Sequence, residues 1–270
     1  MWEKVQETAK YISDKTGFAP KYGVILGSGL GSFTDDIDVE FTLNYNEIPN
    51  FPVSTVKGHS GCLVFGKIGQ NNVVAMKGRF HYYEGYTMQE VTFPVRVMKA
   101  LGIDKLIVSN ASGGVNPFYK VGDIVIIYDH INFFPEHPLR GENDERFGPR
   151  FLNMHEAYSR KMIAKAKEIA LAKEIDVKDG IYLGLQGPTY ETMSEYRMVK
   201  IVGADCVGMS TVPEVIVARH MNMEVFGLSV ITDMGNEEGI ESLSHDEVLE
   251  AAKKAEPQVR ALIKELIIKY

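Results

Sequence analysis

The stretch Tyr22-Gly-Val-Ile-Leu-Gly-Ser-Gly-Leu-Gly-Ser32 contains the pattern that decides the fold. Its first half is apolar and short, which is typical of a strand that is covered on both faces. Its second half has glycine at positions 27, 29 and 31, and these let the backbone turn tightly and point N–H groups at an anion. The spacing differs from the dinucleotide-binding fingerprint, and no Walker lysine follows. The stretch therefore predicts a buried strand that ends in a plain tight turn or in an anion-binding loop.

Similar strand signals alternate with helix signals along the rest of the chain. Further strands are predicted at residues 63–65, 73–76, 105–109, 124–127, 181–185 and 225–231. A long amphipathic helix is predicted at 155–174, and the last helix begins at Ser244. Capping boxes are predicted at Thr192-x-x-Glu195, Thr211-x-x-Glu214 and Ser244-x-x-Glu247. This alternation predicts one α/β domain over residues 1–270, with helices on both sides of a mixed sheet.

The composition excludes several classes of protein. With 45% hydrophobic and 24% charged residues, the chain of 270 residues is typical of a globular protein. The net charge of −7 argues against a broad nucleic-acid surface, although a few focused cations can still hold a small anion. Cys62 and Cys206 fit neither a zinc site nor a disulfide framework, and we expect two buried thiols. Residues 1–15 predict an amphipathic helix rather than a signal peptide, so we expect a cytoplasmic protein with no membrane segment.

Polar side chains and glycines follow several of the predicted strands. Arg79 offers a planar fork of donors that matches an oxyanion, and His81 lies two residues further along. The run 109–114, Ser-Asn-Ala-Ser-Gly-Gly, would let a flat ligand approach the backbone. Ser210 precedes a helix whose N-terminus favours anions. Each motif also has an ordinary explanation: a surface arginine, a tight turn or a helix cap.

Two further positions are open to a structural and a functional interpretation. Tyr190 and Glu191 place an aromatic ring and a carboxylate just before a helix, where Glu191 either favours the helix dipole or accepts from a ring N–H. His245 lies in the first turn of the last helix, so it is expected to be neutral and either to pack or to bond a hydroxyl. Taken together, Ser28, Arg79 and Ser210, with His81, offer donors suited to one phosphate.

At this point the motifs resemble a known family. The chain is similar to the trimeric purine nucleoside phosphorylases and the related methylthioadenosine phosphorylases from the first strand onward. The segments that carry the resemblance are colinear and lie at 26–31, 78–86, 110–114, 143–148, 187–191 and 207–220. The resemblance implies a nucleoside phosphorylase fold, with a partly barrel-like central sheet flanked by helices, and phosphate-dependent cleavage of purine nucleosides.

The resemblance also implies roles for individual residues. Those expected to hold phosphate are Ser28, His59, Arg79, His81, the N–H of Ala111, and Ser210. Those expected at the ribose are Tyr83, Met209, His245 and Phe151, the last reaching into a neighbouring subunit of a homotrimer. Those expected at the purine are Ala111, Gly113, Tyr190, Glu191 and Asp233. His81, Glu191 and Asp233 would be the catalytic side chains, and inorganic phosphate would be a co-substrate without a metal or organic cofactor.

Two residues bear on the substrate. His245 is where the family binds a free 5′-hydroxyl, which favours a nucleoside over methylthioadenosine. Asp233 stands where enzymes selective for 6-oxopurines carry asparagine. An ionised carboxylate can only accept, so Asp233 must be protonated to serve a 6-oxopurine, or it accepts from the 6-amino group of adenine. We therefore expect inosine and guanosine as substrates, with adenosine accepted. The alternatives are a methylthioadenosine phosphorylase and a non-catalytic nucleoside-binding module.

Overall fold

The computed structural model describes residues 1–53, 61–235 and 244–270, with the side chain of His245 left out. The strands are β1 (Tyr22–Ile25), β2 (Asp38–Asn44), β3 (Cys62–Ile68), β4 (Asn71–Lys77), β5 (Lys105–Gly114), β6 (Ile124–Asn132), β7 (Val177–Gly184), β8 (Cys206–Gly208) and β9 (Glu224–Met234). The helices are α1 (Trp2–Thr16), α2 (Met88–Ala100), α3 (Arg160–Ala172), α4 (Met193–Ile201), α5 (Val212–His220) and α6 (His245–Lys269). Short 3₁₀ turns lie at Gly31–Asp36, Tyr45–Glu47 and Tyr82–Glu84.

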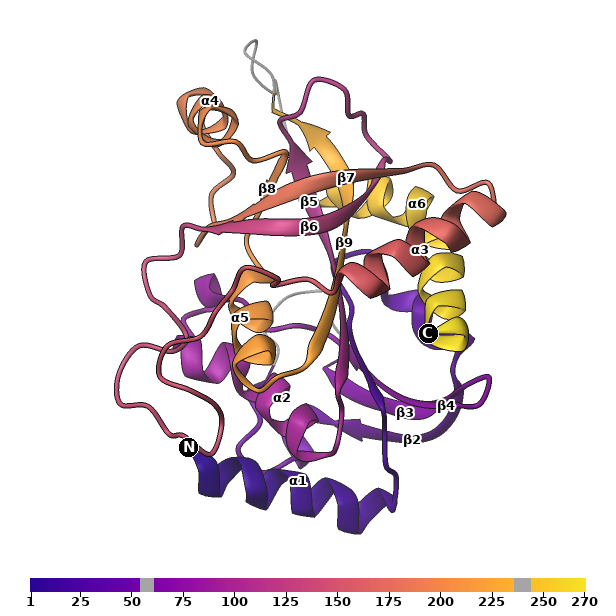
Figure 1. The fold of residues 1–270 in the computed structure, drawn as a ribbon, viewed down its shortest axis with the longest axis vertical. Coiled ribbons are helices and arrows are strands. Elements are labelled where there is room, and N and C mark those ends of the chain that lie inside the picture. Colours follow the sequence, from indigo (N-terminus) through magenta and orange to yellow (C-terminus); the bar gives the residue numbers. More distant parts are fainter. Residues whose placement is uncertain (54–60, 236–243) are drawn as a thin grey trace.

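The sheet is mixed and partly closed. Its strand order is β2-β3-β4-β1-β5-β8-β7-β6-β9, and β5 also pairs with β9. The strands β5, β8, β7, β6 and β9 therefore form a closed, barrel-like ring, from which β1, β4, β3 and β2 extend (Figure 1). β1 and β9 both run parallel to β5, so their carboxyl ends meet at one edge of the sheet. The expected mixed and partly barrel-like α/β fold is confirmed.

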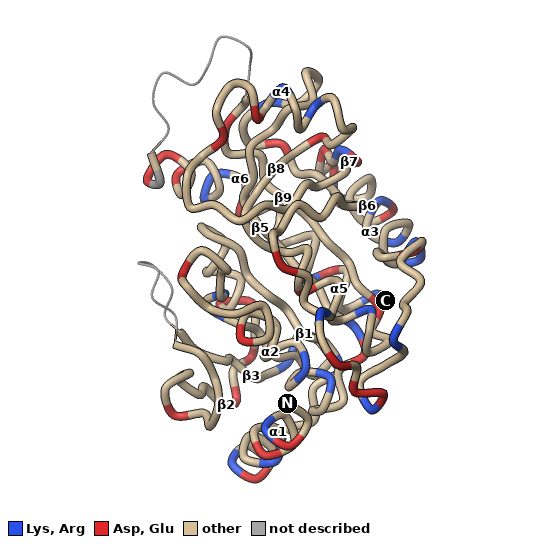
Figure 2. The backbone as a smooth tube through the Cα atoms, turned by 90° about the vertical axis from the view of Figure 1, so that its left-hand side faces the viewer, with Lys and Arg blue, Asp and Glu red and all other residues tan. Residues whose placement is uncertain are grey.

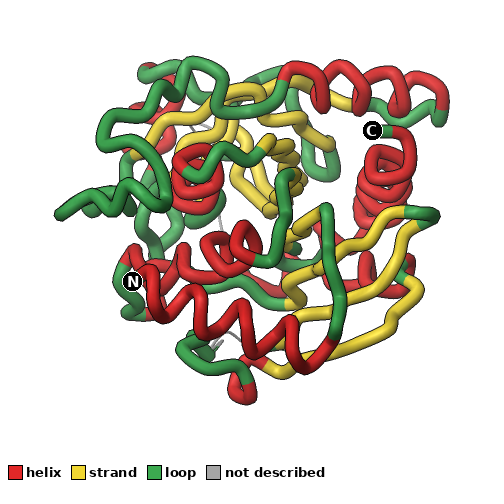
Figure 3. Tube along the Cα trace, turned by 60° about the horizontal axis from the view of Figure 1, so that its bottom comes forward, coloured by secondary structure: helices red, strands yellow, loops and turns green. Residues whose placement is uncertain are grey.

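Helices cover the sheet on several sides (Figure 3). α1, α2 and α5 share one apolar core with the sheet, and α3 and α6 share a second with β1, β3 and β9. α4 packs on β7 and β8 through a smaller cluster that includes Tyr196 and Val199. Figure 2 shows that positions of Lys and Arg are interspersed with positions of Asp and Glu along the helices and loops. None of the helices in the described ranges is long and apolar enough to cross a membrane.

Several elements differ from the sequence-based prediction. Strand β2 was not predicted, because it is an exposed edge strand whose polar residues hide the apolar signal. The helix predicted at 155–174 begins only at Arg160, because the Ser159 hydroxyl accepts from the N–H of Met162 and caps it there. It ends before Glu174, which has a positive φ of 56°. The capping boxes at Thr192 and Ser244 are confirmed.

Candidate active site

A cavity of about 410 Å³ lies where the carboxyl ends of β1, β5 and β9 meet. Pockets of this size, at the carboxyl ends of parallel strands, are where α/β proteins bind small ligands. The walls come from β5, β8 and β9 and from the segments that follow β1, β4, β7 and β8; Val248 of α6 adds to them. The lining residues are Ser28, Arg79, His81, Tyr83, Asn110, Ala111, Ser112, Gly113, Pro188, Tyr190, Glu191, Val207, Gly208, Met209, Ser210, Thr232, Asp233 and Val248.

Most of the residues that were predicted for the site form part of the wall of this one cavity. They are Ser28, Arg79, His81, Tyr83, Ala111, Gly113, Tyr190, Glu191, Met209, Ser210 and Asp233. Arg79 and Ser210, which are far apart in the sequence, are hydrogen-bonded at 3.2 Å. Phe151 is not among the lining residues, and its side chain is 91% exposed. His59 and the side chain of His245 lie outside the described part of the chain.

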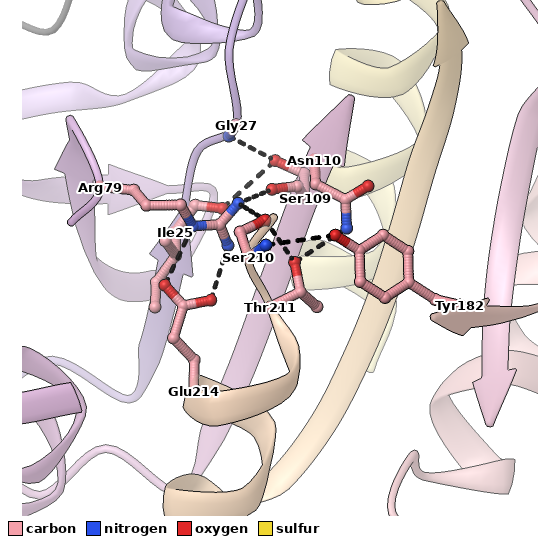
Figure 4. Close-up of polar contacts among 9 residues, drawn as sticks. All are labelled: Ile25, Gly27, Arg79, Ser109, Asn110, Tyr182, Ser210, Thr211 and Glu214. Atoms are coloured by element: carbon pink, nitrogen blue, oxygen red, sulfur yellow. Dashed lines mark hydrogen bonds and ion pairs between the residues drawn. The ribbon is translucent and has the colours of Figure 1, made fainter. Parts of the chain in front are cut away.

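The guanidinium of Arg79 is buried and faces a carboxylate that was not predicted to meet it (Figure 4). Its Nε and Nη2 donate to Oε1 and Oε2 of Glu214 at 2.9 and 2.8 Å. Its Nη1 donates to the carbonyl of Ser109 at 2.7 Å and to the Ser210 hydroxyl. Because the side chains of Arg79 and Glu214 are only 1% and 4% exposed, each needs the other's charge.

This pairing corrects one prediction and bears on another. The fork of Arg79 was expected to match an oxyanion, and in the structure its Nε and Nη2 donate to Glu214. Glu214 was expected to complete a capping box with Thr211, but Thr211 makes no side-chain cap to α5. The reason is that a buried guanidinium requires a charged partner more than a helix end requires a cap. Arg79 therefore positions Ser210 and joins the end of β4 to α5.

Thr211 has a strained backbone directly after Ser210, which lines the cavity. Its φ and ψ are 70° and −55°, and the N–H of Val212 donates to the carbonyl of Ser210 at 2.7 Å. This is a γ-turn of the rare type with a positive central φ, and a β-branched residue adopts it only when the surroundings impose it. The Thr211 hydroxyl is held by the amide of Asn110 at 2.8 Å and by the Ser210 hydroxyl at 3.1 Å. The turn holds Ser210 at the entrance to α5.

Hydrogen bonds from β9 and β7 support this turn. Ser229 donates to the carbonyl oxygen of the Asn110 side chain at 2.5 Å and pairs with Ser112 at 2.5 Å. The N–H of Ser210 donates to the Tyr182 hydroxyl at 3.3 Å (Figure 4). Because every oxygen in this network is bonded, Ser210 is held in a defined position.

His81 is oriented by an adjacent carboxylate. Its Nδ1 lies 3.0 Å from Oε1 of Glu84, and its backbone N–H donates to the same oxygen. An ionised carboxylate can only accept, so the Nδ1 atom carries a proton. The ring stacks on Tyr83 with centroids 4.8 Å apart. Burial raises the pKa of Tyr83 to about 12, so Tyr83 is a neutral hydroxyl at the cavity wall.

A second polar group lies where β9 ends. Asp233 is 8% exposed, and it accepts from the hydroxyls of Tyr196 at 3.2 Å and Thr232 at 3.0 Å. Burial raises the pKa of Asp233 and of Glu191, and the charge of Asp233 raises that of Glu191 further. A Cβ on Gly113 would lie 2.9 Å from Asp233 Oδ2, so a glycine is needed at this position.

The glycine loop after β1 is held by α6. The N–H of Ser32 donates to the buried Glu256 at 2.9 Å, and Arg260 donates to the Ser32 hydroxyl at 3.0 Å. Gly29 has a φ of 76°, and a Cβ there would lie 2.6 Å from that of Ala252. The position of Ser28 thus depends on a helix more than 200 residues away in the sequence.

The remaining predictions concern metals and thiols. No cluster of three His, Cys, Asp or Glu side chains suited to a metal ion occurs within the described ranges. Cys62 and Cys206 are buried thiols, as expected, and burial raises the pKa of Cys206 to about 12.

Sequence reasoning missed four residues that shape the site: Asn110, Tyr182, Tyr196 and Glu214. Asn110 lies inside a motif that was singled out, and its amide was a usable signal. The other three are on separate elements, and nothing in the local sequence indicates which side chain each one meets.

The comparisons with known proteins agree with this geometry. The profile of the family described as Phosphorylase superfamily matches residues 21–268. The chain belongs to this family. It is 49% identical over 263 residues to "Purine nucleoside phosphorylase 1" of Geobacillus stearothermophilus, covering 97% of this chain and 96% of the relative.

Solved structures give the same result. Isoform 2 of purine nucleoside phosphorylase from Schistosoma mansoni, in complex with cytosine and ribose-1-phosphate, matches with a TM-score of 0.95 at 41% identity, covering 99% of this chain and 96% of that one. The Schistosoma mansoni purine nucleoside phosphorylase in complex with adenosine matches with a TM-score of 0.94 at 40% identity, covering 99% and 97%. The expected nucleoside phosphorylase fold is confirmed.

Proposed function

We propose that this chain is a purine nucleoside phosphorylase, which cleaves the N-glycosidic bond of purine ribonucleosides and deoxyribonucleosides with inorganic phosphate. The observation that carries this function is the single cavity that combines a group of hydroxyl, imidazole and guanidinium donors with a buried pair of carboxyls. The first group suits an oxyanion and the second suits the polar edge of a purine.

The mechanism follows from the charges that develop as the bond breaks. The sugar becomes positive and the purine becomes negative. A phosphate dianion beneath the sugar stabilises the positive charge, and hydrogen bonds to the purine edge stabilise the negative charge. Phosphate attacks the sugar directly, so a carboxylate nucleophile of the glycosidase type is not needed.

The phosphate contacts are assigned as follows. Ser28 and Ser210 donate to the phosphate oxygens, as does the N–H of Ala111, and His81, whose Nδ1–H faces Glu84, donates from Nε2 in its imidazolium form. Arg79, whose fork faces Glu214, acts mainly by holding Ser210 and by adding positive charge nearby. His59 joins from a segment outside the described residues.

The nucleoside contacts complete the assignment. Tyr83, Met209 and His245 contact the ribose. The purine lies beside Ala111, Gly113 and Tyr190, with Glu191 and Asp233 along its edge. Phe151 contributes to the sugar site of a neighbouring subunit in a homotrimer, and its 91% exposure suits a residue that is covered only in an assembly. One domain over residues 1–270, a cytoplasmic location and independence from metals and organic cofactors remain predictions.

The direct test is release of free base. Inosine, guanosine and adenosine should each yield base and ribose 1-phosphate only when phosphate is present, as followed by chromatography. Release without phosphate would indicate a hydrolase, and no release would indicate a binding protein. Methylthioadenosine turned over better than inosine would favour a methylthioadenosine phosphorylase, although the relatives reported above carry the name purine nucleoside phosphorylase.

Asp233 should decide how well adenosine is accepted. Burial raises the pKa of Glu191 and the charge of Asp233 raises it further, so Glu191 can keep a proton and donate to N1 of adenine. In Asp233→Asn that charge is absent, so the pKa of Glu191 falls and a larger fraction of Glu191 is ionised and opposes the N1 lone pair. We expect kcat/KM for adenosine to fall roughly 10- to 100-fold, while that for inosine stays equal or rises. Unchanged adenosine activity in steady-state assays would contradict this role for Asp233.

A further inference from the structure

Tyr196 lies between the two carboxyls of the base site. It projects from the first turn of α4, and its side chain is 5% exposed. Its hydroxyl donates to Asp233 Oδ2 at 3.2 Å, and it lies close enough to Glu191 for the two groups to influence each other's pKa. A Cβ added to Gly113 would lie 3.3 Å from the Tyr196 hydroxyl and 2.9 Å from Asp233 Oδ2, so both groups face the same point of the backbone. One phenol is thus in reach of both acids.

A phenol in this position can connect two carboxyls in either direction. Its oxygen accepts a hydrogen bond while its O–H donates one. When Asp233 is ionised, Tyr196 donates to Asp233 and accepts from a protonated Glu191. When Glu191 is ionised, the same hydroxyl donates to Glu191 and accepts from a protonated Asp233. Tyr196 itself stays neutral, because burial and the two adjacent carboxylates raise its pKa.

The two arrangements match two kinds of purine. A 6-oxopurine presents an acceptor at O6 and a donor at N1, which suit a protonated Asp233 and an ionised Glu191. A 6-aminopurine presents a donor at the 6-amino group and an acceptor at N1, which suit the opposite arrangement.

We propose that Asp233 and Glu191 share one proton through the hydroxyl of Tyr196, and that the bound base decides which of the two holds it. Tyr196 is therefore a positioning residue that lets one site serve 6-oxo- and 6-aminopurines. The inference rests on the proposed function, which it deepens. In the transfer, the O–H bond of Glu191 breaks, and its proton binds the phenol oxygen. The original phenol proton passes to Asp233 Oδ2, so the pair keeps a single negative charge throughout.

The other groups that face the pair are consistent with a single shared proton. Thr232 donates to Asp233 Oδ1, so Asp233 keeps one other donor when it ionises. Glu191 Oε1 is buried without a hydrogen-bond partner in the described part of the chain. Tyr190 and Glu195 are the other titratable groups nearby. Tyr190 is neutral because burial raises its pKa, and Glu195 is tied to the N–H of Thr192.

The first experiment needs no variant. We expect kcat/KM for inosine and for adenosine, at saturating phosphate, to fall above the same pH, since both reactions lose the same shared proton. Midpoints that differ by a pH unit or more, or a decline for only one nucleoside, would overturn the proposal. In Asp233→Asn the amide donates at every pH, so the alkaline decline for inosine should disappear.

The second experiment removes the hydroxyl. Tyr196→Phe takes a donor from the singly ionised pair, which raises the pKa for its first ionisation. In the pH profiles of kcat/KM for both nucleosides, the acid limb should therefore shift to higher pH by roughly one unit. The matched control is Tyr119→Phe, which deletes a buried hydroxyl that donates to the carbonyl of Asp179 at 2.5 Å, outside the cavity. This control should leave both limbs in place.

The outcomes separate this inference from the proposed function. If the wild-type chain releases no base from any nucleoside in the presence of phosphate, the proposed function itself fails. If wild type acts on both nucleosides but Tyr196→Phe lowers kcat/KM equally at all pH values, Tyr196 has only a structural role and the sharing of a proton is wrong. Thermal melting of Tyr196→Phe shows whether the variant is folded. If the variant is not folded, the pH profiles of the wild-type chain for inosine and adenosine decide whether the two acids share a proton.

Discussion

Glu214→Gln is expected to lower the free energy of unfolding by about 3–5 kcal/mol, because it leaves the buried charge of Arg79 without a counter-ion. Both nitrogens that face Glu214 lie within 2.9 Å of its oxygens, and both side chains are almost fully buried. For a chain of this size the loss corresponds to a fall in melting temperature of roughly 6–20 °C. Differential scanning calorimetry would measure it.

Two controls test the cause. Glu250→Gln breaks an exposed pair with Lys254 at 2.9 Å and should change the free energy of unfolding by less than about 1 kcal/mol. The double variant Arg79→Met with Glu214→Gln removes the uncompensated charge, so it should be more stable than Glu214→Gln alone. If Glu214→Gln were no less stable than Glu250→Gln, the buried pair would not join β4 to α5 as described.

Glu191→Ala is expected to lower kcat/KM for inosine about 10²- to 10³-fold, which is the effect of removing one preorganised hydrogen bond at a closed site. The N1–H of the purine would lose its acceptor in a place that water does not readily reach. The effect should fall on kcat as well as KM, because the hydrogen bond holds the base as it leaves. Steady-state phosphorolysis would measure both constants.

The matched control for this variant is Glu195→Ala. Glu195 lies four residues further along, outside the cavity, and its carboxylate accepts from the N–H of Thr192 at 2.7 Å to cap α4. Its loss should cost about 1 kcal/mol of stability and change kcat/KM little. A comparable loss of activity in both variants would mean that Glu191 acts by shaping the loop rather than by contacting the base.

The sequence was most informative where a signal is local. Apolar runs predicted β1, β5 and β9 because strands covered on both faces need apolar residues at every position. Prediction failed where the local signal is weak, because the polar edge strand β2 shows no apolar run. It also failed where a motif has more than one possible structure, because Thr211-x-x-Glu214 has the residues of a capping box but does not form one. Phe147 lies within the segment 143–148 and had no predicted role, yet it stacks on Arg96, whose Nη1 is buried without a hydrogen-bond partner in the described residues.

The sequence by itself determined the fold class and most of the residues that line the cavity, because glycines, apolar runs and motif order are properties of neighbouring positions. Only the tertiary structure decided which charges meet. It turned Arg79 toward Glu214 and placed Tyr196 between Asp233 and Glu191. The Tyr196–Asp233 and Arg79–Glu214 contacts join residues 37 and 135 positions apart, and a side chain taken out of water must find its partner wherever the fold brings one.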